Sequence, residues 1–346
     1  MQNFMSQPAI SVLIVAYRSG PTLERCLASL RAQTYADYEV VLVDNDEPGM
    51  SDGAAARAAA DDGAIRLISP GANLGFAAGN NLAARAATGR WLAMLNPDAY
   101  PDPDWLRRLA EAAARRPAYR VFTSRQLMDE DPARLDGLGD VMFAAGAPYR
   151  GGYNSPDPGG MAEGEVFSPC GAAMMIDRAL FLSLGGFDET FFCYCEDVDL
   201  GYRLQLTGNA TLLVPDAIVR HEGSASSGGP ASAFAVRYGT RNRMWLLIKN
   251  TPWPLVPVIL PLHLGLLAVV LFTGRRDPPY NRLVWAALKE GWRDRRIALA
   301  SRPAVQASRR APWWKIAAAM SWNPADLLGR RAVIRPLKAD RSAAAP

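Results

Sequence analysis

ISVLIVAYRSGPTLERCLASLRAQTYADYEVVLVDN, residues 10–45, contains two short apolar runs separated by an amphipathic segment. The runs at residues 10–16 and 39–43 have the length of β-strands and are predominantly apolar, as strands covered on both faces require. Between them, Pro21–Gln33 places apolar residues at i, i+3, i+4 and i+7 and begins with proline, which predicts a helix. This order predicts a parallel sheet with right-handed crossovers, whose ligands bind at the carboxyl ends of the strands.

The same alternation continues through the first third of the chain and indicates an α/β fold. We expect further strands at residues 65–69 and 91–95, because both segments are compact and apolar. Helices are expected at residues 76–87 and 103–116.

Residues 121–164 break this alternation, since they are rich in glycine, proline and aspartate. Two interpretations remain open for them: a mobile loop that becomes ordered around a substrate, or a plain connector. Regular structure is expected to return at residues 170–176, in a helix at 196–207, and in short strands at 212–214 and 217–221.

The composition favours a folded protein in a reducing compartment. The 346 residues are 49% hydrophobic and 21% charged, enough apolar material for one large domain or two ordinary ones. The four cysteines form no CxxC pair and are too few to hold together a secreted scaffold, so the cytoplasm is expected. The first cation, Arg18, follows the first apolar run, so this run lacks the charged start of a signal peptide.

The end of the chain is basic and follows a long apolar segment. From Arg275 onward there are 16 Lys and Arg against five Asp and Glu, whereas the whole chain has a net charge of +4. Trp253–Phe272 is uncharged and close to the length that spans a bilayer, but three prolines at 254, 257 and 261 disfavour a helix in its first half. We therefore expect a membrane-associated tail, peripheral or re-entrant, that binds anionic lipid and not nucleic acid. The alternative is a C-terminal helical subdomain whose apolar run packs on the rest of the protein.

Polar residues follow the expected strands where a nucleotide would bind. Asp44 ends the strand at 39–43 and could accept hydrogen bonds from a ribose or a pyrimidine, although a turn or helix cap explains it equally well. Asn73, Gly75 and Asn80 lie at a strand-to-helix junction, where backbone N–H groups can approach a nucleotide closely.

Asn96-Pro97-Asp98 follows the strand at 91–95 and could hold Mg²⁺ or Mn²⁺ through Asp98 and diphosphate oxygens. Only Asp98 is a carboxylate in this segment, and an Asx turn before the next helix is the competing explanation. His221 ends a later strand and could complete such a metal site, although an isolated histidine is more often structural.

The densest group of carboxylates lies around the helix expected at 196–207. Some of them are explained by the helix dipole and by capping. Aromatic residues precede Glu196 and Asp197, and carboxylates beside apolar surface are candidates for proton abstraction. Asp197 is therefore the candidate general base.

Seven segments, taken in order, resemble glycosyltransferase family 2, and within it the rhamnosyltransferase-like members of bacterial polysaccharide assembly. The resemblance covers roughly residues 10–250. The segments are SVLIVAYRSG, VVLVDN, NLGFAAGNN, LNPDAYP, GGFDETFFCYCEDVDLGYRL, VRHEG and RNRMWLLIKN.

The resemblance implies a GT-A fold and an inverting, metal-dependent glycosyltransferase that uses Mg²⁺ or Mn²⁺. It implies dTDP-L-rhamnose as donor, with UDP-sugars as the next choice, and a lipid-linked or glycan acceptor at the cytoplasmic side of the bacterial inner membrane. Asn96 departs from the fuller DxD pattern of the family. The implied roles are nucleotide binding for Ala16, Tyr17, Asp44, Asn73, Gly75, Asn80 and Asn96, metal binding for Asp98 and His221, catalysis for Asp197, and contact with diphosphate or acceptor for Glu196, Arg241 and Arg243.

Three regions are expected: a nucleotide-sugar-binding half at 1–125, an acceptor-binding and catalytic half at 126–250, and the tail at 251–346. Two other functional classes stay open. A sugar nucleotidyltransferase shares the sheet type but needs a Gly-rich basic loop, whereas the first turn here reads YRSGP at 17–21. A catalytically silent membrane scaffold is disfavoured by the clustered carboxylates.

Overall fold

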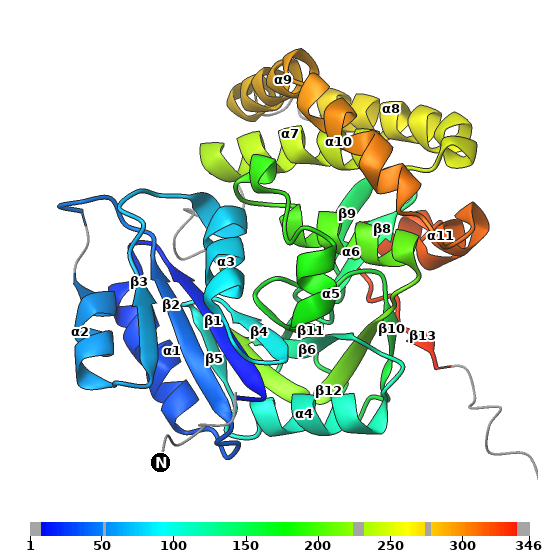
Figure 1. Cartoon of the computed structure of the whole chain (residues 1–346). Coiled ribbons are helices and arrows are strands. Elements are labelled where there is room, and N and C mark those ends of the chain that lie inside the picture. The colour runs from blue at the N-terminus through cyan, green and yellow to red at the C-terminus, as the bar shows by residue number, and fades with distance from the viewer. Residues whose placement is uncertain (1–7, 51–52, 224–231, 274–277, 338–346) are drawn as a thin grey trace, which may run out of the picture.

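The computed structural model describes residues 8–50, 53–223, 232–273 and 278–337, and a mixed β-sheet lies at its centre (Figure 1). The sheet contains β1 (Ile10–Ala16), β2 (Tyr38–Asp44), β3 (Ile65–Ile68), β4 (Trp91–Leu95), β5 (Ala99–Pro101), β6 (Val121–Met128), β7 (Leu135–Gly137), β10 (Gly164–Val166), β11 (Ala173–Asp177), β12 (Thr211–His221) and β13 (Arg335–Pro336). Its order is β13-β10-β12-β6-β11-β4-β1-β2-β3, with β5 paired to β12 and β7 paired to β6. A separate hairpin consists of β8 (Asp140–Phe143) and β9 (Ala147–Arg150).

Helices cover both faces of the sheet. They are α1 (Gly20–Arg31), α2 (Ala54–Asp61), α3 (Gly75–Ala86), α4 (Trp105–Arg115), α5 (Arg178–Ser183), the 3-10 turn η1 (Glu189–Phe191) and α6 (Glu196–Thr207). Buried side chains of α1, α2 and α4 form one core against the sheet, and those of α3, α5 and α6 form a second core on the opposite face. The result is a three-layer α/β/α arrangement.

The first third of the chain folds as its pattern predicts. β1 pairs in parallel with β2 and β4, and β2 pairs in parallel with β3. The expected helices are present as α1, α3 and α4, with ends shifted by a residue or two. The α/β class is thus confirmed, while β11 lies antiparallel between β4 and β6 and makes the sheet mixed.

The prediction of a loop at residues 121–164 is wrong. This region contains β6, β7, the β8–β9 hairpin and the start of β10, and β6 is a central strand paired with β11 and β12. Two buried polar side chains of β6 have partners: Ser124 Oγ accepts a hydrogen bond from the Trp105 indole at 2.8 Å, and Thr123 Oγ1 accepts one from the Cys170 N–H at 3.3 Å. Paired polar groups let this strand lie in the core without an apolar pattern.

The two short strands expected at 212–214 and 217–221 form one continuous strand, β12, with a register shift between Val214 and Ile218. β12 pairs with β6 along its length and with β5 at its end. The expected division between residues 125 and 126 falls inside β6, so the sheet continues across it.

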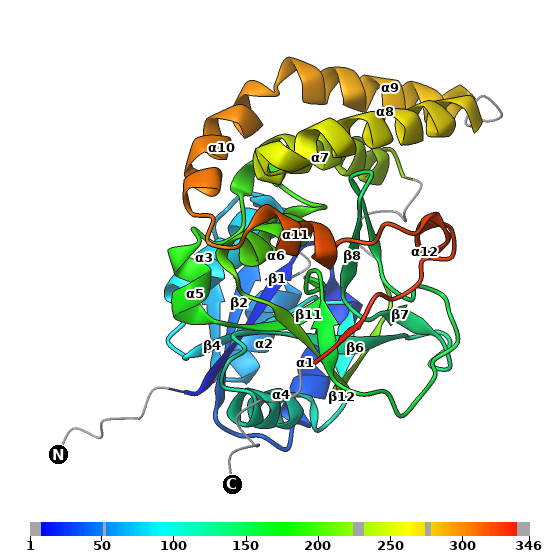
Figure 2. The ribbon, with the colours of Figure 1, turned by 90° about the vertical axis from the view of Figure 1, so that its right-hand side faces the viewer.

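The rest of the chain is helical. It contains α7 (Ala233–Asn250), the 3-10 turn η2 (Trp253–Leu255), α8 (Val256–Thr273), α9 (Pro278–Arg293), α10 (Arg296–Ala307), α11 (Trp313–Ala319) and α12 (Pro324–Leu328). Figure 2 shows α7, α8 and α9 stacked above the sheet, with α10 and α11 descending beside it. Helices α6, α7, α10 and α11 share a third core, and β13 pairs with β10, so this part of the chain packs on the catalytic body.

The expectation that prolines disrupt the first half of the apolar segment is wrong, because α8 runs without interruption from Val256 to Thr273. Pro254 lies in η2 and Pro257 in the first turn of α8. In a first turn, the backbone N–H that proline lacks would have no hydrogen-bond partner within the helix. Pro261 is the proline inside the helix, and it removes one hydrogen bond. By length and composition, Trp253–Thr273 is one helix among the described residues that could cross a membrane.

Candidate active site

A cavity of about 630 Å³ opens at the carboxyl ends of the parallel strands. Its walls come from residues that follow β1, β2 and β4, from the first turns of α3 and α6, and from the start of α7. This is where a parallel α/β sheet binds its ligands. The structure brings together eight of the residues named from the sequence: Tyr17, Asn73, Gly75, Asn96, Asp98, Glu196, Asp197 and His221.

One wall of the cavity is built by amides that join two loops. Asn45 Oδ1 accepts a hydrogen bond from the Leu74 N–H at 2.9 Å, and Asn45 Nδ2 donates to Asn73 Oδ1 at 3.1 Å. Asn73 Oδ1 also accepts from the Gly75 N–H at 2.9 Å. These bonds fix the turn after β3 beside the end of β2, and Tyr17 after β1 completes the wall.

Gly75 begins α3 with a φ of +77°, a conformation that residues with a side chain rarely adopt. A Cβ at this position would lie 2.5 Å from the Phe192 ring. Glycine is therefore required both for the backbone turn and for the close approach of the loop before α6.

Strand pairing brings Asp98 and His221 together. β5 begins directly after Asp98, and its antiparallel pairing with β12 sets Ala99 opposite His221. His221 Nε2 consequently lies 3.3 Å from Asp98 Oδ1, and both side chains are buried at the cavity. Asn96 Oδ1, at the same end of β4, is buried and has no hydrogen-bond partner among the described residues.

Asp136 contacts the His221 ring on the side away from Asp98, and Arg150 contacts Asp136. Asp136 Oδ2 lies 2.8 Å from His221 Nδ1 and accepts a hydrogen bond from Arg150 Nη1 at 2.5 Å. Burial would raise the pKa of Asp136, but Arg150 and His221 lower it to about 2. Burial alone would lower the pKa of His221, but its contacts with Asp136 and Asp98 raise it to about 9. A carboxylate on Nδ1 fixes the imidazole so that Nε2 faces the cavity.

Asp197 is the carboxylate that the protein aims into the cavity from α6. Its Oδ2 accepts a hydrogen bond from the Gly171 N–H at 3.0 Å, and its Oδ1 accepts one from the Val198 N–H at 2.8 Å. These two bonds hold the carboxylate and leave a lone pair free on each oxygen. The neighbouring Glu196 is buried, and its burial together with the negative charge of Asp197 raises the pKa of Glu196 well above its usual range.

Asp197 belongs to a cluster with Asp140 and Cys170, in which one possible ligand atom of each residue lies within 4.8 Å of the others. Burial raises the pKa of the Cys170 thiol to about 12, so this sulfur stays protonated and is a poor metal ligand. Burial and the charge of Asp197 raise the pKa of Asp140 well above its usual range. Burial therefore disfavours the charged forms of Asp140 and Cys170 beside Asp197.

Five of the named residues do not line the cavity. Ala16 is buried at the end of β1, Asn80 donates to the Phe76 carbonyl within α3, and Asp44 Oδ1 accepts from the Asp46 N–H at 3.3 Å. Arg241 donates through Nη2 to the carbonyls of residues 190 and 191, and Arg243 lies on the same helix outside the cavity.

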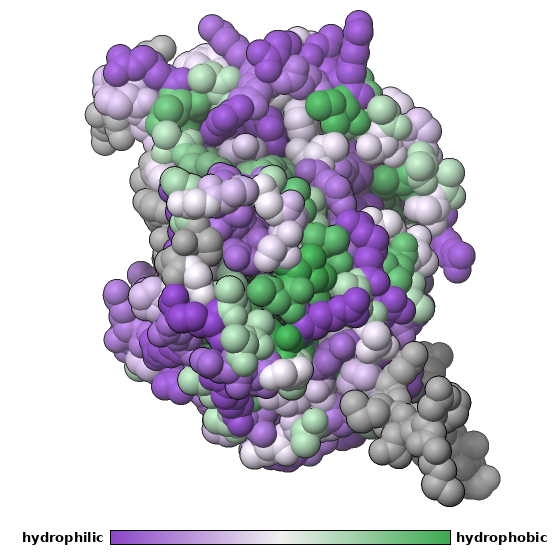
Figure 3. All heavy atoms as spheres, turned by 60° about the vertical axis from the view of Figure 1, so that its left-hand side comes forward, coloured by the Kyte–Doolittle hydropathy of each residue, from purple (hydrophilic) through white to green (hydrophobic). Residues whose placement is uncertain are grey.

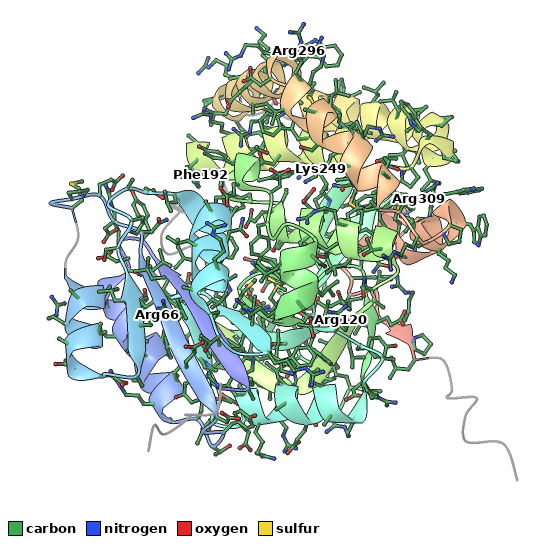
Figure 4. The ribbon with its side chains drawn as sticks, viewed as in Figure 1. Arg66, Arg120, Phe192, Lys249, Arg296 and Arg309 are labelled. Atoms are coloured by element: carbon green, nitrogen blue, oxygen red, sulfur yellow. The ribbon has the colours of Figure 1, made fainter. Side chains whose placement is uncertain are left out.

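The other carboxylates of the dense cluster have structural partners. Asp188 accepts from Lys249 Nζ at 2.6 Å, and Asp199 accepts from Lys249 at 2.9 Å and from Arg203 Nε at 2.8 Å. Lys249, labelled in Figure 4, reaches these two carboxylates from α7. Asp197 and Glu196 are thus the members of the cluster that reach the cavity.

Comparisons with known proteins show the family of this chain. The family model described as "Glycosyl transferase family 2" matches residues 11–181. An N-acetylglucosaminyl-diphospho-decaprenol L-rhamnosyltransferase of Mycobacterium tuberculosis is 31% identical over 278 residues, covering 72% of this chain and 87% of the relative. The chain belongs to glycosyltransferase family 2. It is therefore a glycosyltransferase, and the family expected from the seven sequence segments is confirmed.

A further relative of this glycosyltransferase is the O-antigen biosynthesis protein RfbC of Myxococcus xanthus. It is 31% identical over 266 residues, which cover 71% of this chain and 20% of the relative. Both relatives thus align with most of this chain, beyond the residues that the family model matches.

Two solved structures share the fold of this glycosyltransferase. They are the crystal structures of GalNAc-T7 with UDP, GalNAc and Mn²⁺ and of residues 1–349 of S. aureus TarS. The first has a TM-score of 0.57 at 17% identity and covers 70% of this chain and 48% of its own. The second has a TM-score of 0.55 at 13% identity and covers 86% of this chain and 90% of its own. At these identities the likeness concerns the fold.

Proposed function

We propose that this glycosyltransferase transfers L-rhamnose from dTDP-L-rhamnose to the sugar of a lipid-linked acceptor, with inversion at the anomeric carbon. The observation that carries the proposal is the sharing of one cavity by Asp197, the Asp98–His221 pair and the amide wall around Asn73. In this proposal Asp197 is the base, the Asp98–His221 pair binds the leaving diphosphate, and the amide wall around Asn73 binds the nucleoside of the same donor molecule. The choice of rhamnose and of a lipid-linked acceptor is supported by the name of the mycobacterial relative.

In the proposed reaction, the acceptor hydroxyl gives its proton to the Asp197 carboxylate. The hydroxyl oxygen bonds to the anomeric carbon while the bond from that carbon to the diphosphate oxygen breaks, and the electron pair leaves with the nucleoside diphosphate. Attack from the face opposite the leaving group inverts the configuration. General-base assistance of this kind is worth roughly 10²–10⁴ in rate.

The residues at the end of β4 fit a divalent cation. Asp98 supplies a carboxylate, and Asn96 Oδ1 is a buried oxygen without a hydrogen-bond partner among the described residues. His221 would bind the ion through Nε2 only after losing the proton that its raised pKa favours, so its binding would depend on pH. Oxygen ligands with few protein carboxylates suit Mg²⁺ or Mn²⁺, which take further ligands from a diphosphate. Such an ion would neutralise the charge that develops on the leaving diphosphate.

The proposed function is tested with purified full-length protein, a divalent cation, the acceptor and a panel of nucleotide sugars. We expect release of nucleoside diphosphate to be fastest with dTDP-L-rhamnose and to depend on both the acceptor and the cation. A UDP-sugar that is used faster than dTDP-L-rhamnose would contradict the donor assignment.

We also propose that the enzyme lies on the cytoplasmic face of a bacterial inner membrane. The support comes from α8, which packs on the body along one stripe around Ile259, His263 and Leu266. His263 Nδ1 lies 2.9 Å from the Ala145 carbonyl oxygen, which ties α8 to the β8–β9 hairpin. The opposite face is apolar and exposed, with Val258, Leu260, Leu262, Leu264, Val269 and Phe272 between 44% and 69% exposed.

The neighbouring α9 carries exposed tryptophans and cations of its own. Trp285 and Trp292 are 51% and 62% exposed, and Arg282, Lys289 and Arg296 are exposed on the same helix or at the start of the next. Figure 3 shows hydrophilic side chains crowding the upper edge of the molecule, with apolar patches between them. Tryptophan and basic side chains are typical of the interface between water and anionic lipid. Because α8 contacts the body along its length, a position in the plane of the membrane surface fits this helix better than one that crosses the membrane. Arg275 and Arg276, which are also expected to bind lipid, lie outside the described residues.

A further inference from the structure

The loop that joins η1 to α6 has an unusual backbone. Phe192, Tyr194 and Cys195 have φ values of +66°, +69° and +68°, in the left-handed region that residues other than glycine seldom occupy. Such conformations persist only where the surroundings enforce them, and they gather at functional sites. Three left-handed residues within four positions therefore require a structural cause and suggest a functional role.

The structural cause is Asn242 on α7. Its amide Nδ2 donates to three carbonyl oxygens of this loop: to Phe191 and Cys193 at 2.9 Å and to Tyr194 at 2.7 Å. Asn242 is fully buried, and Arg241 beside it donates to the Phe191 carbonyl at 3.1 Å. Helix α7 thus holds the loop in its left-handed form.

The effect of this conformation is to assemble four aromatic rings, which we call the aromatic wall: Phe192, Tyr194, Phe234 and Tyr238. The Phe192 ring stacks on Tyr238 at 5.3 Å between centroids, and Phe234 lies 4.7 Å from Tyr238 and 6.0 Å from Tyr194. All four rings line the cavity into which Asp197 points, and Figure 4 shows Phe192 between α3 and α7. Phe234 is 37% exposed, so part of the wall is open to a ligand.

We infer that the aromatic wall is the acceptor subsite, an inference that rests on the proposed function. The sugar ring of a lipid-linked acceptor packs against these rings and directs a hydroxyl toward Asp197. The apolar face of a pyranose ring, made of C–H groups, suits the electron-rich face of an aromatic ring. Tyr194, whose carbonyl Asn242 binds, lies three residues before Asp197, so the clamped loop leads directly into the turn of α6 that carries the base.

The surroundings of α7 favour a lipid-linked sugar over the nucleobase of the donor as the occupant. Val236 lies between Phe234 and Tyr238 in sequence, and it packs in a buried cluster with Leu267 and Leu271 of α8 and with residues of α9. The first turns of α7 therefore present rings to the cavity on one side and contact the apolar α8 on the other. An acceptor could place its sugar on the wall while its lipid chain extends toward the exposed face of α8.

The test uses the full chain and, as acceptor probe, N-acetylglucosamine diphosphate carrying a short prenyl chain. For Phe234→Ala we expect the KM for the probe to rise about tenfold or more, while the KM for dTDP-L-rhamnose and the slow hydrolysis of the donor by water change less than about twofold. Phe234→Tyr keeps the ring and should restore the KM for the probe. Leu182→Ala, at a residue of similar exposure outside the cavity, should leave both KM values unchanged.

Two results would overturn the inference. One is a KM for the probe that stays within about twofold of the parent in Phe234→Ala, and the other is a rise confined to the KM for the donor, which would assign the wall to the nucleotide. Binding of the probe alone, followed by saturation transfer to its sugar protons, decides the question without turnover. Transfer that is seen with the parent and lost in Phe234→Ala supports the aromatic wall as the acceptor subsite, and equal transfer in both proteins refutes it. Absence of turnover with every donor would refute only the proposed function.

Discussion

Asp197 and Glu196 are adjacent in sequence, but their carboxyl groups meet different surroundings. Asp197 is held by two backbone N–H groups at the cavity, whereas the Glu196 Oε2 is buried and has no hydrogen-bond partner among the described residues. Burial and the nearby charge of Asp197 raise the pKa of Glu196 and so disfavour its charged form. The proposed function therefore gives the role of general base to Asp197 and not to Glu196.

Asp197→Asn preserves the size of the side chain and removes its basicity, so we expect turnover to fall by about a hundredfold or more while donor affinity stays within a few-fold. Steady-state kinetics and calorimetry with the donor measure the two effects separately. Asp216→Asn, at an exposed carboxylate on β12, is the matched control and should behave as the parent. Near-normal turnover in Asp197→Asn would remove Asp197 from the mechanism.

Asp98→Ala should abolish the tightening of nucleoside diphosphate binding that Mg²⁺ or Mn²⁺ produces, because the carboxylate of the proposed ion site is lost. His221→Ala should show a milder form of the same loss. Calorimetric titration of the nucleoside diphosphate with and without the cation gives the measurement. The same enhancement by metal in Asp98→Ala and in the parent would show that the ion, if bound, is held elsewhere.

Much of the cavity could be predicted residue by residue, because its groups follow strands that the hydrophobic pattern makes visible. Asn73, Asn96 and Asp98 lie in such places, and the structure sets all three at the cavity. Asp136 and Arg150 could not be predicted, since they lie in the region expected to be a loop and reach His221 only through the pairing of β7 with β6 and of β8 with β9.

At the scale of elements, the sequence predicted strands well where they are apolar and poorly where they are not. β1 and β4 are apolar and were expected, whereas β6 carries Thr123, Ser124 and Gln126 at 0% exposure. A buried polar side chain gives no apolar pattern, and its partners become known only from the fold. The aromatic wall was missed for a related reason, because its rings come from two segments that the Asn242 bonds join.

Helix α7 is joined to α6 by a buried cation. Lys249 is 3% exposed and bridges Asp188 and Asp199, and Asp199 also accepts from Asn250 at 2.7 Å. Lys249→Met leaves these carboxylates without their cation, so we expect the free energy of unfolding to fall by about 3–5 kcal/mol. Urea titration followed by circular dichroism measures the loss.

Lys315→Met, at an exposed lysine on α11, is the control for this stability change and should have little effect. A loss below about 1 kcal/mol in Lys249→Met would mean that the bridge contributes no more than a surface ion pair.

At the scale of the whole molecule, the catalytic body and the C-terminal helices form a single packed structure. Arg302 on α10 donates to the Ile248 and Thr251 carbonyls, and Gln306 donates to the carbonyl of Asn250 at 2.9 Å. A chain cut after Asn250 would lose these bonds and expose the third core. Binding to a membrane is therefore better tested by surface substitutions than by truncation.

Leu260→Glu combined with Leu264→Glu places two charges on the exposed face of α8, where the parent is 51% and 55% exposed. We expect the parent to sediment with anionic liposomes, less with neutral ones and less at high salt, since each cation near an anionic surface contributes on the order of 1 kcal/mol. The double variant should stay in the supernatant. Leu182→Glu, on α5, is the control and should sediment as the parent does. Sedimentation of the double variant to the same extent as the parent would contradict the membrane assignment.

The most direct test of the central claim is one NMR time course with the full chain, a divalent cation, dTDP-L-rhamnose and N-acetylglucosamine diphosphate carrying a short prenyl chain. Phosphorus signals identify the phosphate product, and the anomeric proton of the transferred sugar reports its configuration. The account predicts that nucleoside diphosphate appears together with a rhamnosyl product whose anomeric configuration is opposite to that of the donor. Pyrophosphate among the products, or a product with the donor's configuration, would contradict it.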